Sequence, residues 1–179
     1  VDDDTDPSSI KVRSAGALID YLAAAGFVPQ RIDGPELYQA LATGVVDGAH
    51  WGAAVGALSM KFWEVAKYHM KPSILIANDV FVVNLAAYNK LPDDLKLIFT
   101  SLLEERYYRR TAEYQQQEAV ALSTGVQKLG VEVVEYPAAV QEKFAQASKA
   151  ILDKEMAKGP VAKDMGEKLI AFMGELGYV

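Results

Sequence analysis

The feature that most constrains the fold is a long stretch in the second half of the chain that lacks helix-breaking residues. After Pro92 the sequence runs to about Lys128 with no further proline, and its first glycine is Gly125. Asp93 and Asp94 follow the proline directly, and acidic side chains at this place favour the positive end of a helix dipole. The stretch therefore predicts either one very long helix or two abutting helices.

Short apolar segments alternate with helical segments in the rest of the chain. The segments expected to form strands are residues 10–12, 27–32, 45–51, 74–84 and 131–135. The segments expected to form further helices are residues 15–25, 35–44, 53–68, 138–158 and 160–176. Strands that alternate with helices indicate the α/β class, although the last part of the chain is mostly helical.

Composition excludes several classes of protein. The chain has 179 residues, of which 51% are hydrophobic, enough for one ordinary domain or two small lobes with a core. A net charge of -6 without a basic patch argues against nucleic acid as a partner. The absence of cysteine excludes a disulfide framework and a thiolate metal site. No apolar run approaches the length that a membrane-spanning helix needs, and no signal peptide is visible.

The sequence offers no catalytic motif. It contains no GxSxG nucleophile elbow, no HExxH metal motif and no glycine-rich phosphate loop. The two histidines, His50 and His69, occur in no metal-ligand spacing, and neither has a clear second titratable group to act with. We therefore predict a protein that is not an enzyme and uses no cofactor, with a histidine-dependent enzyme as one alternative.

Three residues are candidates for direct ligand contact. Arg13 ends the first expected strand, where a guanidinium can present its planar fork to a carboxylate, and ligands favour this end of strands. The alternative is an ordinary surface arginine. Trp51 lies in a turn rich in glycine and alanine, where it could stack on a ligand or fill the core. His50 beside it could bond to a ligand or to a backbone group.

Five segments occur in an order that resembles one family. They are IKVR at residues 10–13, GPELYQALATGVVDGAHW at 34–51, KFWEVAKY at 61–68, VVN at 82–84 and LPDDL at 91–95. The family pattern resembles K-x-R followed, after a spacer, by E-x-Y-x-A-L-x-x-G-x-x-D-G. The chain looks like the second half of a TRAP-transporter substrate-binding protein, one of the DctP family of periplasmic receptors. Each motif alone is weak, whereas the ordered set is specific.

The resemblance implies a fold, a function and roles for two residues. The fold would be α/β and periplasmic-binding-protein-like (type II-like), with two lobes that close on an organic acid and then dock on the membrane permease. A Trp after D-G-x-x resembles the branch that binds 2-oxo acids and similar small carboxylates. By position, Arg13 corresponds to the carboxylate-clamping arginine and Trp51 to a ligand-contact position in the cleft. Asn78 is a further candidate for a polar ligand contact, with a structural turn as its alternative.

One departure from the family pattern affects metal binding. The 2-oxo-acid branch usually has Glu just before that Trp, where it helps to hold a cation that bridges to the ligand, and here the residue is His50. A second family acid falls on apolar residues near Ile74–Ile76. Neutral imidazole is a poor partner for a hard cation, which prefers oxygen. We therefore predict no ligand-bridging metal and a hydrogen-bonding role for His50.

The resemblance also divides the chain. Residues 1–8 are expected to be a flexible tail or an expression remnant, and residues 9–78 a second ligand-binding lobe. Residues 79–179 would supply a crossing strand, the long helix and C-terminal helices that complete a first lobe, which is otherwise largely absent. Such a piece would expose apolar surface and favour pairing of two copies through the long helices. A helical partner module at residues 92–176 is therefore a second alternative, and the expected location is periplasmic.

Overall fold

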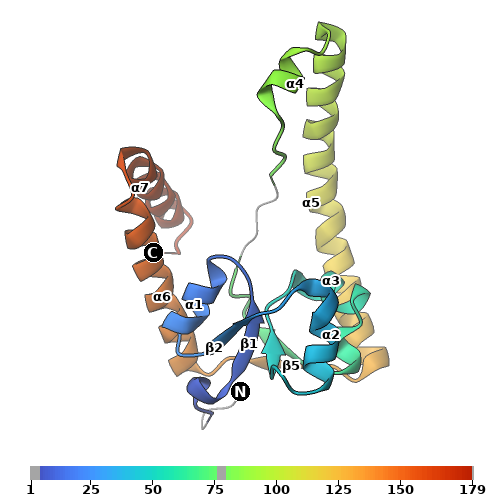
Figure 1. The fold of residues 1–179 in the computed structure, drawn as a ribbon, viewed down its shortest axis with the longest axis vertical. Helices are drawn as coiled ribbons and strands as arrows, with labels where there is room; N and C mark the ends of the chain where they lie inside the picture. The colour runs from blue at the N-terminus through green and yellow to red at the C-terminus, as the bar shows by residue number, and fades with distance from the viewer. Residues whose placement is uncertain (1–4, 76–79, 179) are drawn as a thin grey trace. The chain divides into compact units, whose positions relative to one another are not determined.

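The structure is a computed structural model that describes residues 5–75 and 80–178 (Figure 1). Its elements in chain order are η1 (Pro7–Ser9), β1 (Lys11–Ser14), α1 (Leu18–Ala24), β2 (Val28–Arg31), α2 (Gly34–Ala42), β3 (Gly48–Ala49), α3 (Ala53–Ser59), η2 (Phe62–Glu64), β4 (Tyr68–Lys71), α4 (Leu85–Asn89), α5 (Asp93–Leu129), β5 (Glu132–Glu135), α6 (Ala138–Met156) and α7 (Pro160–Glu175). The predicted α/β class is confirmed.

The described chain forms two compact units. The first comprises residues 5–51, 70–72 and 134–178, and the second comprises residues 52–69, 73–75 and 80–133. The division at residues 78 and 79 that the sequence predicts lies at the edge of the described part, and it stays a prediction.

A parallel three-stranded sheet forms the centre of the first unit. Its strand order is β2-β1-β3, so β1 is the middle strand. Helix α1 connects β1 to its neighbour β2, and α2 connects β2 to β3 on the other side of β1. Asp47 fixes one edge of this arrangement, because its carboxylate accepts from Lys11 N at 2.8 Å and its own N–H donates to Lys11 O at 2.9 Å. The Asp-Gly pair of the sequence motif thus aligns β3 with β1.

Aromatic side chains hold α1 and α6 together in the core of the first unit. The Phe144 ring stacks on Tyr21 at 5.2 Å and on Phe27 at 5.7 Å, and the Tyr136 ring meets its edge at 5.3 Å. Burial, followed by the charge of Tyr21, raises the pKa of Tyr136 to about 12. This cluster stays neutral and apolar at physiological pH, and it anchors the C-terminal helices beside the sheet.

The second unit depends on contacts between α3 and α5. The Glu118 carboxylate of α5 accepts from Ala54 N and Val55 N, both at 2.8 Å, and so satisfies two free donors in the first turn of α3. Farther along α5, the buried Trp63 ring lies so close to Gly125 that an added Cβ would be 2.7 Å from it. Gly125 therefore gives Trp63 its place in the core.

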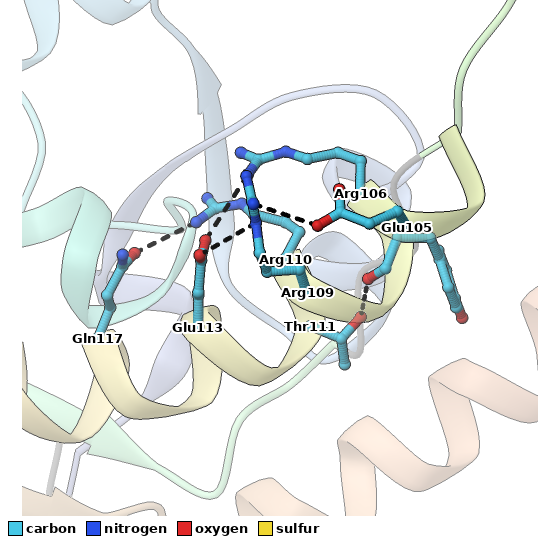
Figure 2. A network of polar contacts seen from close by, with 8 residues as sticks. Glu105, Arg106, Arg109, Arg110, Thr111, Glu113 and Gln117 are labelled. Atoms are coloured by element: carbon cyan, nitrogen blue, oxygen red, sulfur yellow. Dashed lines mark hydrogen bonds and ion pairs between the residues drawn. The ribbon is translucent and has the colours of Figure 1, made fainter. Parts of the chain in front are cut away.

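The long stretch without helix breakers forms one helix, α5, of 37 residues. Figure 2 shows a network of charged side chains along its middle turns. Arg109 pairs with Glu105 at 3.1 Å and with Glu113 at 3.4 Å, both at helical i,i+4 spacing. Exposed pairs of this kind each contribute little, roughly 0.3–0.5 kcal/mol, but they all favour an unbroken helix. The alternative of two abutting helices is wrong.

The predicted helix at residues 53–68 is correct only in its first half. α3 ends at Ser59, and Lys61 then takes a left-handed conformation with φ of 60°. The chain continues into η2 and the unpredicted strand β4, which pairs with β5. A non-glycine residue rarely adopts this conformation, so helical spacing alone did not reveal the break.

The predicted strand at residues 74–84 is wrong where the structure describes it. Residues 74, 75 and 80–84 form no strand, and the remainder of that segment lies outside the described residues. Val82 is 91% exposed and Val80 73% exposed, so this apolar run is not buried by the described chain. A strand needs a neighbour for its backbone groups, and no described strand pairs with this segment.

Candidate functional site

Arg13 occupies the carboxyl end of β1, the middle strand of the sheet. In the parallel register it lies between Gln30 of β2 and Ala49 of β3, so the residues that follow those strands converge on it. Its Nε donates to the Ile32 carbonyl at 2.9 Å, and its Nη1 donates to the His50 carbonyl at 3.1 Å. Two carbonyls from two neighbouring strand ends thus hold the guanidinium in one orientation.

Trp51 covers this guanidinium. The Arg13 Cζ atom lies 4.7 Å from the centroid of the Trp51 ring, within the range of a cation–π contact. Such a contact stabilises by about 0.5–2 kcal/mol, depending on how far water is excluded. The hydrogen bonds and the stack together account for the position of the arginine.

Arg13 remains a cation in this setting. Partial burial lowers its pKa, and the negative charge of Asp33 raises it in opposition. Arginine starts from so high a pKa that the guanidinium stays protonated at physiological pH. The described hydrogen bonds use Nε and one N–H of Nη1, whereas a guanidinium carries five N–H donors.

His50 is joined to the same strand end by its backbone. The His50 N–H donates to the Arg13 carbonyl at 2.8 Å, and the His50 carbonyl accepts the hydrogen bond from the Arg13 side chain. Burial lowers the pKa of the His50 imidazole, and the Arg13 charge lowers it further. The ring is therefore neutral at physiological pH, with one nitrogen donating and the other accepting.

The structure brings three of the four predicted site residues together. Arg13, His50 and Trp51 share one edge of the sheet, although their contact with a ligand stays a prediction. Asn78 lies outside the described residues. His69 belongs to the second unit, where its ring meets the Trp63 ring edge-on at 5.9 Å.

Sequence reasoning missed the turn between β2 and α2. Ile32 contributes a carbonyl, Asp33 a charge, and Gly34 a surface without a side chain against Trp51. Asp33 stands at the N-cap position of α2, yet its carboxylate accepts no capping hydrogen bond from the first turn of the helix. The Asp-Gly-Pro sequence was a signal for a turn here, but nothing in it indicated contact with Arg13 or Trp51.

The described residues contain no group of three or more acidic or histidine side chains placed to hold a metal ion. None of the described helices is both long enough and apolar enough to pass through a membrane. The site does include one carboxylate near the guanidinium, because the charge of Asp33 acts on Arg13. The nitrogen of His50 is a poorer ligand for a hard cation than a carboxylate oxygen.

Comparison with known proteins gives consistent matches. The family model described as bacterial extracellular solute-binding protein, family 7 (DctP), matches residues 3–159. A monocarboxylate 2-oxoacid-binding periplasmic protein of Nostoc sp. is 24% identical over 174 residues, which is 96% of this chain and 48% of that protein.

Solved structures agree on the fold. A TRAP periplasmic solute-binding protein from Colwellia psychrerythraea, with bound calcium and pyruvate, is 26% identical with a TM-score of 0.73, over 92% of this chain and 53% of that one. A TRAP transporter solute-binding protein from Bordetella bronchiseptica RB50, with calcium and picolinate, is 23% identical with a TM-score of 0.74, over 94% and 52%. The predicted periplasmic-binding-protein-like fold is confirmed, and the chain spans about half the length of these relatives.

We expect the pH dependence of stability to report on His50. Its pKa in the folded protein lies below the ordinary value of 6.5, so between these two values the unfolded chain binds more protons. The free energy of unfolding should therefore rise with pH across this window. The stability that the folded protein has while His50 is neutral should be lost as the pH falls. Urea unfolding from about pH 8 to about pH 5 measures it. His50→Gln should flatten this part of the profile, and an unchanged profile would contradict the assignment.

Proposed function

Because the chain belongs to family 7 of the bacterial extracellular solute-binding proteins, we propose that it forms the ligand-binding part of a receptor for a small organic acid. The observation that carries this proposal is the held guanidinium: Arg13 is fixed by two carbonyls and covered by Trp51. A cation fixed before binding loses little entropy when a carboxylate arrives.

Arg13 clamps the carboxylate in this proposal. The planar fork gives two parallel charge-assisted hydrogen bonds to the two carboxylate oxygens, which a flexible ammonium does not reproduce. Trp51 forms an apolar wall beside this pair and limits access of water. The neutral His50 imidazole then bonds to a second polar group of the ligand, such as the keto oxygen of a 2-oxo acid.

Cation binding separates this site from two of its relatives. The Colwellia psychrerythraea protein holds calcium with pyruvate, and the Bordetella bronchiseptica protein holds calcium with picolinate. We propose that this chain binds its acid without a bridging cation, because His50 offers nitrogen and stays neutral beside the Arg13 charge.

The complete protein would work as a receptor outside the cytoplasmic membrane. Two lobes would close on the acid by hinge motion, and the closed form would dock on the permease subunits of a TRAP transporter. Release would follow because docking favours the open state. Members of the family are described as solute-binding proteins, which supports a receptor rather than an enzyme for this chain.

Exposed apolar side chains support the expected division into lobes. Before and along the first half of α5 the exposed apolar residues include Val80, Phe81, Val82, Leu85, Leu97, Ile98 and Leu102. On α7 they include Val161, Met165, Leu169 and Phe172. We propose that residues 79–179 pack against a further lobe in a complete protein, and that the 179-residue chain alone pairs reversibly with a second copy through α5.

Binding of organic acids should depend on Arg13. A ligand at about a hundred times its Kd stabilises the native state by roughly 2.7 kcal/mol, so the complete protein should show a raised Tm with one class of carboxylate. Arg13→Ala should abolish this rise, and Arg13→Lys should recover little of it because the fork is lost. Arg31→Ala, at the exposed end of β2, is the matched control and should keep the full rise. A rise that survives in Arg13→Ala would show that the carboxylate binds elsewhere.

Binding should also be independent of added cations. Isothermal titration with the best acid should give the same Kd in EDTA and in calcium for the unsubstituted protein. His50→Glu supplies the carboxylate oxygen that calcium prefers, so this variant should bind the acid more tightly when calcium is present. His50→Gln is the control, and calcium should not affect it. A His50→Glu variant that ignores calcium would count against the position assigned to residue 50.

The exposed face of α5 should control self-association. Light scattering after size exclusion should give the 179-residue chain a mass that rises with protein concentration. Leu102→Glu places a charge on the apolar face, where it would be buried on pairing, and should reduce the mass toward the monomer. Gln116→Glu adds the same charge on the exposed polar part of α5 and should leave the association unchanged. A monomer at every concentration would refute pairing through this face.

A further inference from the structure

We infer that Gly34 is a positioning residue: the missing side chain gives the Trp51 indole its place, and Trp51 in turn keeps the Arg13 guanidinium in position. This inference rests on the proposed function, because it assigns to the β2–α2 turn the geometry of the carboxylate clamp. It concerns a residue that touches neither the guanidinium nor, in the proposal, the ligand.

The space between Gly34 and Trp51 has no room for a methyl group. A Cβ built on Gly34 would lie 2.8 Å from Cη2 of Trp51, 3.6 Å from Cζ3 and 3.8 Å from Cζ2. Carbon atoms that are not bonded pack at about 3.5–4.0 Å, so the first of these contacts is a clash. All three atoms belong to the far edge of one rigid ring, which can give way only by moving as a whole.

Movement of that ring would disturb Arg13. The face of the Trp51 ring stacks on the guanidinium at 4.7 Å, while its outer edge abuts Gly34. An indole has only two side-chain torsions, so a shift at the edge also tilts or slides the face. The contact at residue 34 is therefore coupled to the stack on Arg13 through a single rigid body.

The backbone at residue 34 does not need a left-handed conformation, but this residue directly precedes Pro35 in the first turn of α2. Gly34 is the first residue of α2, and its φ lies outside the left-handed range that only glycine adopts readily. Glycine is also a poorer helix former than alanine. A Cβ directly before a proline disfavours the helical conformation, so Gly34→Ala adds backbone strain as well as the clash with Trp51. Only the clash depends on Trp51, so a change at Trp51 separates the two effects.

The β2–α2 turn thus acts on Arg13 in three ways within three consecutive residues. Ile32 accepts the hydrogen bond from Nε, Asp33 provides an opposing charge, and Gly34 sets the place of the stacked ring. This short turn therefore affects a hydrogen bond of Arg13, the electrostatic potential at its guanidinium and the ring that stacks on it. We expect all three to influence the affinity of Arg13 for an acid.

A double-substitution cycle tests the inference. The variants are Gly34→Ala, Trp51→Phe and the two combined; phenylalanine lacks the outer indole atoms that meet residue 34. Gly34→Ala should weaken carboxylate binding about tenfold, the scale expected of overpacking. In the Trp51→Phe background the same change should have little effect on Kd. Gly48→Ala is the matched control, because an added Cβ there meets nothing within 4 Å.

Fluorescence gives a readout that does not need a ligand. The chain has two tryptophans, and Trp63 is 3% exposed, so a change in acrylamide quenching reports mainly on Trp51. Gly34→Ala should raise the quenching constant of the 179-residue chain, and Gly48→Ala should not.

The possible outcomes separate the inference about Gly34 from the proposed function. Unchanged quenching in Gly34→Ala would overturn the inference, as would an equal loss of affinity with and without Trp51. If Gly34→Ala fails to fold, the combined variant decides: a folded combined variant supports the inference, and an unfolded one overturns it. A different result would refute the proposed function alone: Gly34→Ala raises the quenching, but the unsubstituted complete protein binds no carboxylate. The inference that Gly34 positions Trp51 would then stand.

Discussion

The candidate site depends on one charge held at the carboxyl edge of a parallel sheet. A guanidinium that is partly removed from water loses hydration, and this loss must be offset by acceptors nearby. The register of β1 with β2 and β3 supplies them, since the chain leaves each neighbouring strand with a carbonyl directed at Arg13. Trp51 then covers the cation with a ring face instead of a second charge. The cation is thus solvated by neutral groups and keeps its capacity to attract an anion.

Two neighbouring residues, His50 and Asp33, set the balance of charges around Arg13. Burial and the nearby cation both lower the pKa of His50, so the imidazole adds no positive charge. Asp33 acts on Arg13 from a distance without an ion pair among the described contacts. The residues at this edge of the sheet thus supply one cation and one neutral hydrogen-bonding ring.

Residues that act through their side chains were easier to predict than residues that act through their backbone or through an empty space. The helix starts at Pro92 and Pro160 and the strand that carries Arg13 follow from local chemistry. The ordered motifs singled out Trp51, whose contact with a ligand stays a prediction. Ile32 contributes only a carbonyl, so its identity carries no signal. Gly34 contributes the absence of a side chain, which a sequence does not distinguish from the freedom needed in a turn. The strand expected near Val82 failed because apolar residues mark burial only when a partner is present.

The second unit carries an apolar face that the described chain leaves uncovered. Its buried cluster unites α3, η2 and the last turns of α5 around Trp63, while the first half of α5 carries its apolar residues in the open. Burial of apolar area stabilises a protein by about 25 cal/mol per Å². Because this face stays in water, the chain does not gain the free energy that its burial would give. The ion pairs around Arg109 keep the helix continuous across the boundary between the two halves, at little cost in water. The first half of α5 meets α4 through the Tyr88 and Phe99 rings, whose centroids lie 6.0 Å apart, while its other apolar side chains stay exposed.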